Sequence, residues 1–314
     1  VLHTFGYKPL QQYLVAFPGG RMQVPRVSWD VVKRKWFHQY AGQKIDHHDW
    51  LHWSRGGQNW NTMCASCHST NLQKNYAPEA DSFHTTWSTI TVSCESCHGP
   101  ASKHVDFAKS GGYRKGEKPE HGYLLPVKDS LNTTMINTCA PCHARKSDIG
   151  QTALHTGEIM DDLIPEIPTT EHFHADGQVN DEDYIYTSFL QSKMYRRNVQ
   201  CSNCHDPHSG KRLLMGNALC LQCHAKTYDD FQHQRHDVAR VQIGCESCHM
   251  PGKLYMGNDL RHDHGFRVPR PDQSVKYGTP NACNSCHKDK KASWAAEAVR
   301  SEEHTSELQS RLHL

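Results

Sequence analysis

The sequence predicts a mainly α fold with little regular structure, in which short helices and loops do not enclose a large aliphatic core. Three observations support this class. The motif Cys-x-x-Cys-His occurs seven times and uses all 14 cysteines. Apolar residues make up only 36% of the 314 residues, and the mean hydropathy is −0.76. Neighbouring motifs start as little as 19 residues apart, as at Cys201 and Cys220, which leaves room for one helix and one loop.

The repeated motif is the signature of covalent haem c attachment, because the two thiols add across the haem vinyl groups and the histidine ligates the iron. Its spacing puts both sulfurs on one side of a helical turn. We therefore expect seven haems, with the protein wrapped around a haem stack. The cysteines are Cys64, Cys67, Cys94, Cys97, Cys139, Cys142, Cys201, Cys204, Cys220, Cys223, Cys245, Cys248, Cys283 and Cys286. The histidines are His68, His98, His143, His205, His224, His249 and His287.

Other cysteine chemistries explain this pattern less well. A zinc site needs sets of Cys and His ligands, but it gives no reason for a histidine after every second cysteine. A thioredoxin-like redox pair would occur once, beside a βαβ pattern. A disulfide framework would not keep every pair at the same close spacing.

Charge and hydropathy limit the function classes. The formal charge is +2, but each bis-histidine haem with its propionates adds about −1, so the haem-loaded protein is expected near −5. Nucleic-acid binding has no support, and other redox proteins or cytochromes are the expected partners. The chain has no apolar stretch of 18 residues, so we predict no membrane span in it. Because haem is attached outside the cytoplasmic membrane, we expect a periplasmic or extracellular protein, although no signal peptide is visible.

Residues 1–60 form an N-terminal haem-packing segment without a motif, which we expect to be truncated. The stretches YLVAF (13–17) and VVKRKWF (31–37), separated by Pro18-Gly19-Gly20 and Pro25, predict a small β hairpin leading into a helix. Three tryptophans before the first motif are suited to pack against haem edges, namely Trp50, Trp53 and Trp60.

Residues 61–290 form the predicted multihaem domain. Its longest gap between motifs, from Cys139 to Cys201, contains TSFLQSKMYRR, which predicts a helix. Residues 291–299 begin a helical region that we expect to be cut short. Residues 300–310 read RSEEHTSELQS, which a common sequencing-adapter oligonucleotide encodes in frame. We therefore interpret residues 300–314 as an assembly artefact and exclude them from the fold.

The remaining histidines are candidates for the second axial ligand of each iron. Of the 25 histidines, seven lie in motifs and two, His304 and His313, in residues 300–314, which leaves 16. A histidine just after its own motif, such as His104 or His208, cannot reach the opposite face of the same haem and should serve another. Our distal candidates are His52, His104, His155, His174, His208, His236 and His264. His48, His84, His172, His233 and His262 compete with these neighbours, whereas we expect His3, His38, His47 and His121 to be structural or exposed.

Several segments resemble multihaem c-type cytochromes with cytochrome c554-like and doubled-CxxCH domains, often followed by tetratricopeptide repeats. They are GYKPLQQYLVAFPGG (6–20), NWNTMCASCHSTNLQKNY (59–76), CESCHGPASKH (94–104), SFLQSKMYRRNVQCSNCHDPHSG (188–210) and HDHGFRVPRPD (262–272). The resemblance covers residues 1–299. It implies an exported electron-transfer protein, an eighth haem site before Val1 and helical repeats after WAAEAV (294–299), but it names no substrate.

The sequence leaves three functions open: an electron carrier, a multihaem oxidoreductase, and a filament subunit that acts as a carrier. Haems with two histidine ligands have no free coordination site and only exchange electrons, which favours an electron carrier. A multihaem oxidoreductase for a small nitrogen or sulfur species would need one five-coordinate iron. The CxxCK motif of pentahaem nitrite reductases does not occur, and Lys193 and Tyr195 are conceivable site residues of a hydroxylamine oxidoreductase-like enzyme. A subunit of an extracellular cytochrome filament would share the carrier chemistry.

Overall fold

The computed structural model describes residues 1–111, 132–150, 159–182, 184–237, 241 and 243–300. The chain forms two compact units. The first comprises Val1–Glu166 with Leu254–Leu260, and the second comprises Ile167–Lys253 with Arg261–Leu314. Motifs 1 to 3 therefore lie in the first unit and motifs 4 to 7 in the second. Among the described residues, no helix is long and apolar enough to cross a membrane.

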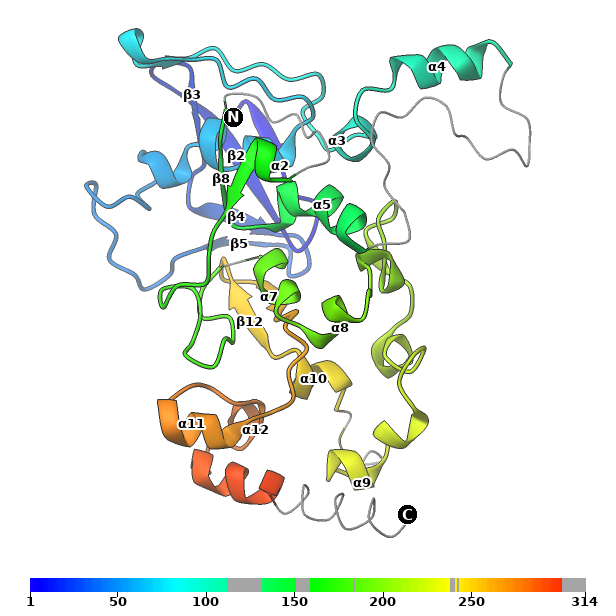
Figure 1. The fold of residues 1–314 in the computed structure, drawn as a ribbon. Coiled ribbons are helices and arrows are strands. Elements are labelled where there is room, and N and C mark those ends of the chain that lie inside the picture. The colour runs from blue at the N-terminus through cyan, green and yellow to red at the C-terminus, as the bar shows by residue number, and fades with distance from the viewer. Residues whose placement is uncertain (112–131, 151–158, 183, 238–240, 242, 301–314) are drawn as a thin grey trace. The chain divides into compact units, whose positions relative to one another are not determined.

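The first unit begins with a five-stranded antiparallel sheet (Figure 1). Its strands are β1 (His3–Phe5), β2 (Leu10–Phe17), β3 (Arg21–Gln23), β4 (Val27–Asp30) and β5 (Lys35–His38). The order is β1-β2-β4-β5, and β3 also pairs with β2. The predicted turn joins β2 to β3, with Gly19 at φ 68° and Gly20 at φ 69°, a left-handed conformation that favours glycine.

The core of the first unit lies between this sheet and the first motif. Its buried side chains are Leu14, Met22, Val24, Trp60, Ala65 and Leu72. Helix α1 (Trp60–Met63) is held to β3 by Asn61, whose Oδ1 accepts a 2.8 Å hydrogen bond from the backbone N–H of Met22. Asn61 is fully buried, so this bond fixes the start of the motif 1 helices against the sheet.

Short elements make up the rest of the first unit. After α2 (Ala65–His68) come β6 (Tyr76–Ala77), η2 (Pro78–Ala80) and β7 (Ser82–Phe83), followed by α3 (Glu95–His98) and α4 (Ser102–Lys109). Helix α5 (Asn132–His143) carries the third motif. The unit then has β8 (Lys146–Asp148), α6 (Ile159–Asp162) and β9 (Leu163–Pro165), with β8 and β9 antiparallel. The 3-10 turn η1 (Gly56–Gln58) precedes α1.

The second unit consists almost entirely of single helical turns and two-residue strands. In chain order they are α7 (Tyr186–Leu190), α8 (Lys193–Arg196), η3 (Cys201–Asn203), β10 (His205–Asp206), β11 (Lys211–Arg212), η4 (Gly216–Leu219), η5 (Lys226–Tyr228), α9 (Phe231–Gln234) and α10 (Cys245–His249). The chain continues with β12 (Gly252–Tyr255), which pairs with β13 (Asp259–His262); residues Leu254–Leu260 of this hairpin are assigned to the first unit. The second unit then has α11 (Pro271–Tyr277) and α12 (Ala282–Cys286). Residues 292–300 are helical.

Polar contacts hold this unit together. Arg267 donates hydrogen bonds to the carbonyl oxygens of Asp176 and Gly177 and to Oε1 of Gln191. Asp263 is buried and accepts hydrogen bonds from the backbone N–H groups of Val179 and Gly265. These bonds tie the loop around residue 177 to residues 263–267, which fixes the backbone on either side of His264.

The structure corrects three expectations. The fold is a mixture of short helices and small sheets rather than mainly α, because the first 38 residues pair as five strands instead of one hairpin. The segment 31–37 does not lead into a helix and ends in β5. The helix expected over 187–197 is broken into α7 and α8 at Ser192, whose hydroxyl caps α8 by accepting from the N–H of Tyr195.

Candidate haem-binding sites

Most of the motifs form a single helical turn. At motifs 1, 2, 5 and 7 the backbone N–H of the histidine donates to the carbonyl of the first cysteine, at 2.9 to 3.1 Å. Motifs 3 and 6 lie within α5 and α10. Residues three and four apart share one face of such a turn, so both thiols and the imidazole can address one haem. Motif 4 differs, since η3 leads directly into β10 at His205.

Three pairs of histidine rings face one another in the second unit, and each pair includes one motif histidine. The ring centroids lie 6.4 Å apart for His205 and His264, and 6.1 Å apart for His249 and His233. The third pair, His287 and His236, has a separation of 6.0 Å. The interplanar angles of the three pairs are 28°, 9° and 33°.

This separation is larger than direct ring contact. The rings of His47 and His48, which touch, have centroids 3.8 Å apart. A metal–imidazole bond is about 2.0 Å long, and the ring centroid lies about 1.1 Å beyond the nitrogen, so two imidazoles on opposite sides of one metal have centroids about 6.2 Å apart. The three pairs therefore have the spacing of two axial ligands on one haem iron.

Hydrogen bonds orient several of these rings in the way that a metal ligand requires. Nδ1 of His264 lies 2.8 Å from the carbonyl oxygen of His262, and Nδ1 of His249 lies 2.8 Å from that of Arg267. Nδ1 of His236 lies 2.5 Å from the carbonyl oxygen of Gln234. A carbonyl only accepts, so Nδ1 is the donor and Nε2 is left with a lone pair for iron. The residues present thus fit bis-histidine haem ligation.

The segment around α9 supplies two of the three partner histidines. His233 lies inside α9 and faces His249, whereas His236 lies just beyond its end and faces His287. Arg235 between them is left-handed, with φ 55°, and this turn of the chain lets the two rings approach different motifs. Sequence reasoning ranked His233 behind its neighbour. The sequence feature that could have indicated its role is the spacing of His233 and His236. Two histidines three residues apart can serve two different haems and need not compete for one.

The other motif histidines have different surroundings. The ring of His68 lies 5.3 Å from that of Phe5, and burial lowers the pKa of His68. The ring of His224 lies 6.2 Å from that of Tyr228, edge to face. Nδ1 of His98 is buried, as is that of His104 on α4.

The remaining distal candidates occupy varied places. His104 lies on α4, six residues after His98. His52 is half-buried, with Nδ1 2.9 Å from the Ser54 hydroxyl. His174 begins a tight turn, in which its N–H donates to the carbonyl of Gln178. His208 is exposed between β10 and β11, while His155 lies outside the described residues.

Thiols from different motifs lie side by side within each unit. Sγ of Cys67 in motif 1 is 3.8 Å from the Pro141 carbonyl oxygen and 3.9 Å from that of Cys142, in motif 3. A hydrogen bond with the Cys142 thiol lowers the pKa of Cys67 to about 7, and the same contact raises that of Cys142. In the second unit, burial and then the adjacent Cys220 thiol raise the pKa of Cys245 to about 11. Motifs 1 and 3 therefore adjoin, as do motifs 5 and 6.

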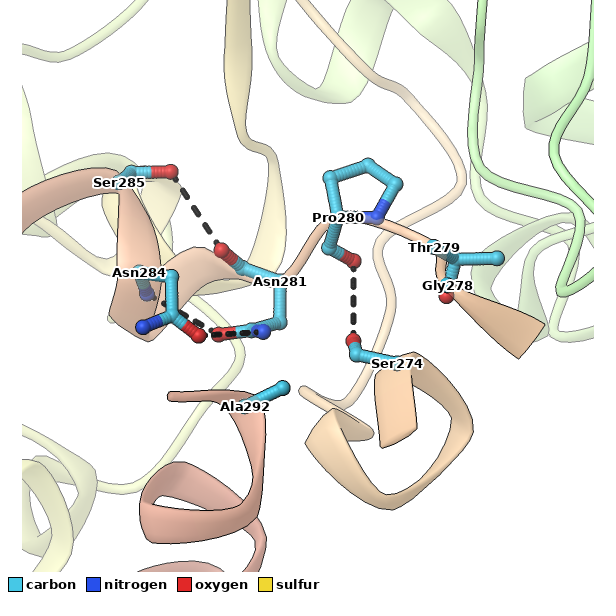
Figure 2. Close-up of a pocket in the computed structure, with 8 residues that line it drawn as sticks. All are labelled: Ser274, Gly278, Thr279, Pro280, Asn281, Asn284, Ser285 and Ala292. Carbon is cyan, nitrogen blue, oxygen red and sulfur yellow. Dashed lines mark hydrogen bonds between the residues drawn. The ribbon is translucent and has the colours of Figure 1, made fainter. Parts of the chain in front are cut away.

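An open pocket of about 400 Å³ lies beside motif 7 (Figure 2). Asn284 and Ser285, the two variable residues of the motif, line it. The side chain of Asn281 caps α12 by accepting a 3.0 Å hydrogen bond from the N–H of Asn284. Neither cysteine of the motif is among the lining residues. The hydrogen bond from Asn284 to Asn281 holds the turn of motif 7 in shape.

Two family models match parts of the chain. The model for cytochrome c554 and c-prime matches residues 35–99, and the doubled CXXCH motif model matches residues 195–228. No curated protein sequence matches the chain.

Two solved structures are similar. The crystal structure of the outer cell wall cytochrome OcwA has a TM-score of 0.62 at 16% identity, over 93% of this chain and 72% of that chain. An undecaheme cytochrome from the S-layer of Carboxydothermus ferrireducens has a TM-score of 0.49 at 16% identity, over 99% of this chain and 54% of that chain.

Together, the repeated motif, the family models and the fold of the first of these structures define the class. The chain is a multihaem c-type cytochrome.

Proposed function

We propose that this protein carries electrons through seven covalent haem c groups, most of them with two histidine ligands, and has no substrate site of its own. The observation that carries the proposal is the set of three histidine pairs, each with centroids 6.0 to 6.4 Å apart. Bound haem supplies an iron that gains and loses one electron. Two imidazoles on one iron leave no position for a substrate.

The chain's own residues hold the cofactors close to one another. The thiol contact of Cys67 with Cys142 places the attachment points of motifs 1 and 3 side by side, and that of Cys220 with Cys245 does the same for motifs 5 and 6. The segment that comprises α9 and the residues just after it serves motifs 6 and 7 together, through His233 and His236. These links support electron exchange within each unit over short distances.

The proposal includes an exported location, outside the cytoplasmic membrane. Covalent attachment at CxxCH takes place there, and the similar cytochromes come from an outer cell wall and an S-layer. Other redox proteins are the proposed donors and acceptors of electrons.

Low-temperature EPR of the oxidised, haem-loaded protein tests this function, with a pyridine haemochrome count on the same sample. We expect seven haems and only low-spin signals. A high-spin signal that responds to nitrite or hydroxylamine would contradict the carrier function and favour an oxidoreductase. A count below seven would contradict the proposed haem content.

A further inference from the structure

A largely buried cluster of three charged side chains lies in the first unit, on β8 and the loop after motif 1. Nζ of Lys74 is 2.6 Å from Oδ2 of Asp148, and Lys146 forms a second ion pair with Oδ1 of the same carboxylate. The side chains of Lys74, Lys146 and Asp148 are 15%, 7% and 11% exposed. Two lysines share one aspartate, so the cluster carries one excess positive charge.

The cluster lies beside the place where motifs 1 and 3 meet. Lys74 follows His68 by six residues, and Lys146 follows His143 by three. Sγ of Cys67 in motif 1 lies 3.8 Å from the carbonyl oxygen of Pro141 and 3.9 Å from that of Cys142 in motif 3. The ion pair between Lys74 and Asp148 joins the chain segments that follow these two motifs. Cys67 and Cys142 belong to the proposed attachment sites of two different haems, so the cluster lies on the segments next to both sites.

We propose that the Lys74–Asp148–Lys146 cluster sets the reduction potentials of the haems attached at motifs 1 and 3, raising them through its excess positive charge. This inference rests on the proposed haem content. The three residues touch neither iron nor substrate; they act on the redox groups through their charge.

The sign follows from electrostatics. Reduction adds one negative charge to a haem, and a nearby positive charge stabilises the reduced form, which raises the potential. The interaction is stronger at a buried site than at the surface, because less water screens it. Since Asp148 offsets one lysine, removing it should raise the potentials further, whereas removing either lysine should lower them.

The test is a haem-resolved redox titration, followed by NMR, of the haem-loaded wild type and of Lys146→Met, Lys74→Met and Asp148→Asn. His68→Met and His143→Met assign the affected signals to motifs 1 and 3. We expect both lysine variants to lower the midpoint potentials of these haems and Asp148→Asn to raise them. Lys146→Arg keeps the charge and should restore the wild-type values.

Glu166→Gln is the matched control. It removes a negative charge from the adjacent β9 end of the same hairpin, but its ion pair with Arg145 is about one-third exposed, so we expect a smaller shift. The inference would be overturned if the lysine variants and Asp148→Asn shifted the potentials in the same direction. It would also be overturned if the potentials did not move in variants with a full haem count. Either result would leave the carrier function intact. A wild type with fewer than seven haems would instead contradict the proposed function on which the inference rests.

Discussion

At the scale of single residues, the motif histidines and cysteines are read directly from the sequence, whereas the second axial ligands stay a prediction that the structure complements with ring distances. The sequence predicted His236 and His264 as distal ligands, and the structure places both opposite a motif histidine. It did not predict which motif each one faces, because the pairing depends on long-range contacts such as those of Arg267. The sequence placed His233 behind its neighbours as a candidate, and the structure sets its ring 6.1 Å from that of His249, beside a left-handed turn at Arg235 that the residue pattern does not reveal.

Replacing His264 tests the pairing with His205. In His264→Met we expect the motif 4 haem to gain a methionine ligand, which raises its potential, while the other six keep theirs. Redox titration with NMR assignment measures this shift. His208→Met is the matched control, since His208 is exposed three residues after His205 and should leave the motif 4 haem unchanged. A motif 4 potential that moves in the control and not in His264→Met would contradict the pairing.

At the scale of elements, α9 shows how a four-residue helix can organise two sites. Asp230 caps it by accepting from the N–H of His233, and Arg235 ends it in the left-handed region. The first motif has a comparable support in Asn61, which joins α1 to β3. The sequence predicted helical turns at the motifs well, because their spacing is local. It did not predict the five-stranded sheet, in which β2 pairs with β4 as well as with its neighbours in the chain, β1 and β3.

The turn at Arg235 gives a prediction for α9. Every L residue, Arg235 included, is strained at φ 55° by about 1–2 kcal/mol. A β-branched residue is strained further, whereas glycine is not strained. Arg235→Val should therefore weaken the ligation at motifs 6 and 7 together, and Arg235→Gly should keep both. The low-spin EPR signals of the two haems report the outcome. Loss of only one signal in Arg235→Val would contradict a shared turn.

The core beside motif 1 gives a stability prediction. Trp60 is 1% exposed and packs edge to face on Trp87, so it belongs to the protein core of the first unit. Trp60→Ala should lower the free energy of unfolding by about 3–5 kcal/mol. Trp50 is 60% exposed, and Trp50→Ala should cost about 1 kcal/mol or less. Urea unfolding of the haem-loaded proteins measures both, and equal losses would contradict this placement of the core.

The β8 strand gives a prediction for pH dependence. Burial alone would raise the pKa of Asp148, but hydrogen bonds from Lys146 and Lys74 and their charges hold it below its ordinary value of 3.8. The folded state thus binds the proton less readily than the unfolded state, and the ion pairs stabilise the fold above that value. Asp148→Asn should lose about 3 kcal/mol of stability near neutral pH.

This difference should shrink as the pH falls below 3.8 and vanish below the folded pKa, because the wild-type carboxyl is then neutral as well. Urea unfolding of both proteins across this range provides the measurement. A difference that stays constant with pH would show that packing, and not charge, is responsible.

At the scale of the whole molecule, the motifs divide between two compact units, three in one and four in the other. The low apolar content predicted a small protein core, and the clearest cluster of buried apolar side chains in the described residues is the one beside motif 1. The mainly α class was wrong for the first unit, because the sheet takes up a segment without motifs. Composition indicates how much core is available, but not where the strands pair.

The total charge gives a prediction for the intact protein. The polypeptide alone has a pI near 8.0, and seven haems with their propionates should bring the net charge to about −5. The haem-loaded protein should therefore focus at an acidic pH and bind an anion exchanger. A variant with every motif cysteine replaced by alanine should focus near the sequence value. Equal isoelectric points for the two proteins would contradict the expected haem content.

The order of the paired histidines along the chain has a consequence for biogenesis. His233 and His236 precede the motif histidines they face, so both partners are already present when motifs 6 and 7 emerge. At motif 4 the order is reversed, because the motif histidine His205 comes before its partner His264 in the chain. With the proposed ligation, we therefore expect the maturing chain to pass through an intermediate in which the haem at motif 4 has only one protein ligand. The haems at motifs 6 and 7 would have both ligands as soon as they are attached.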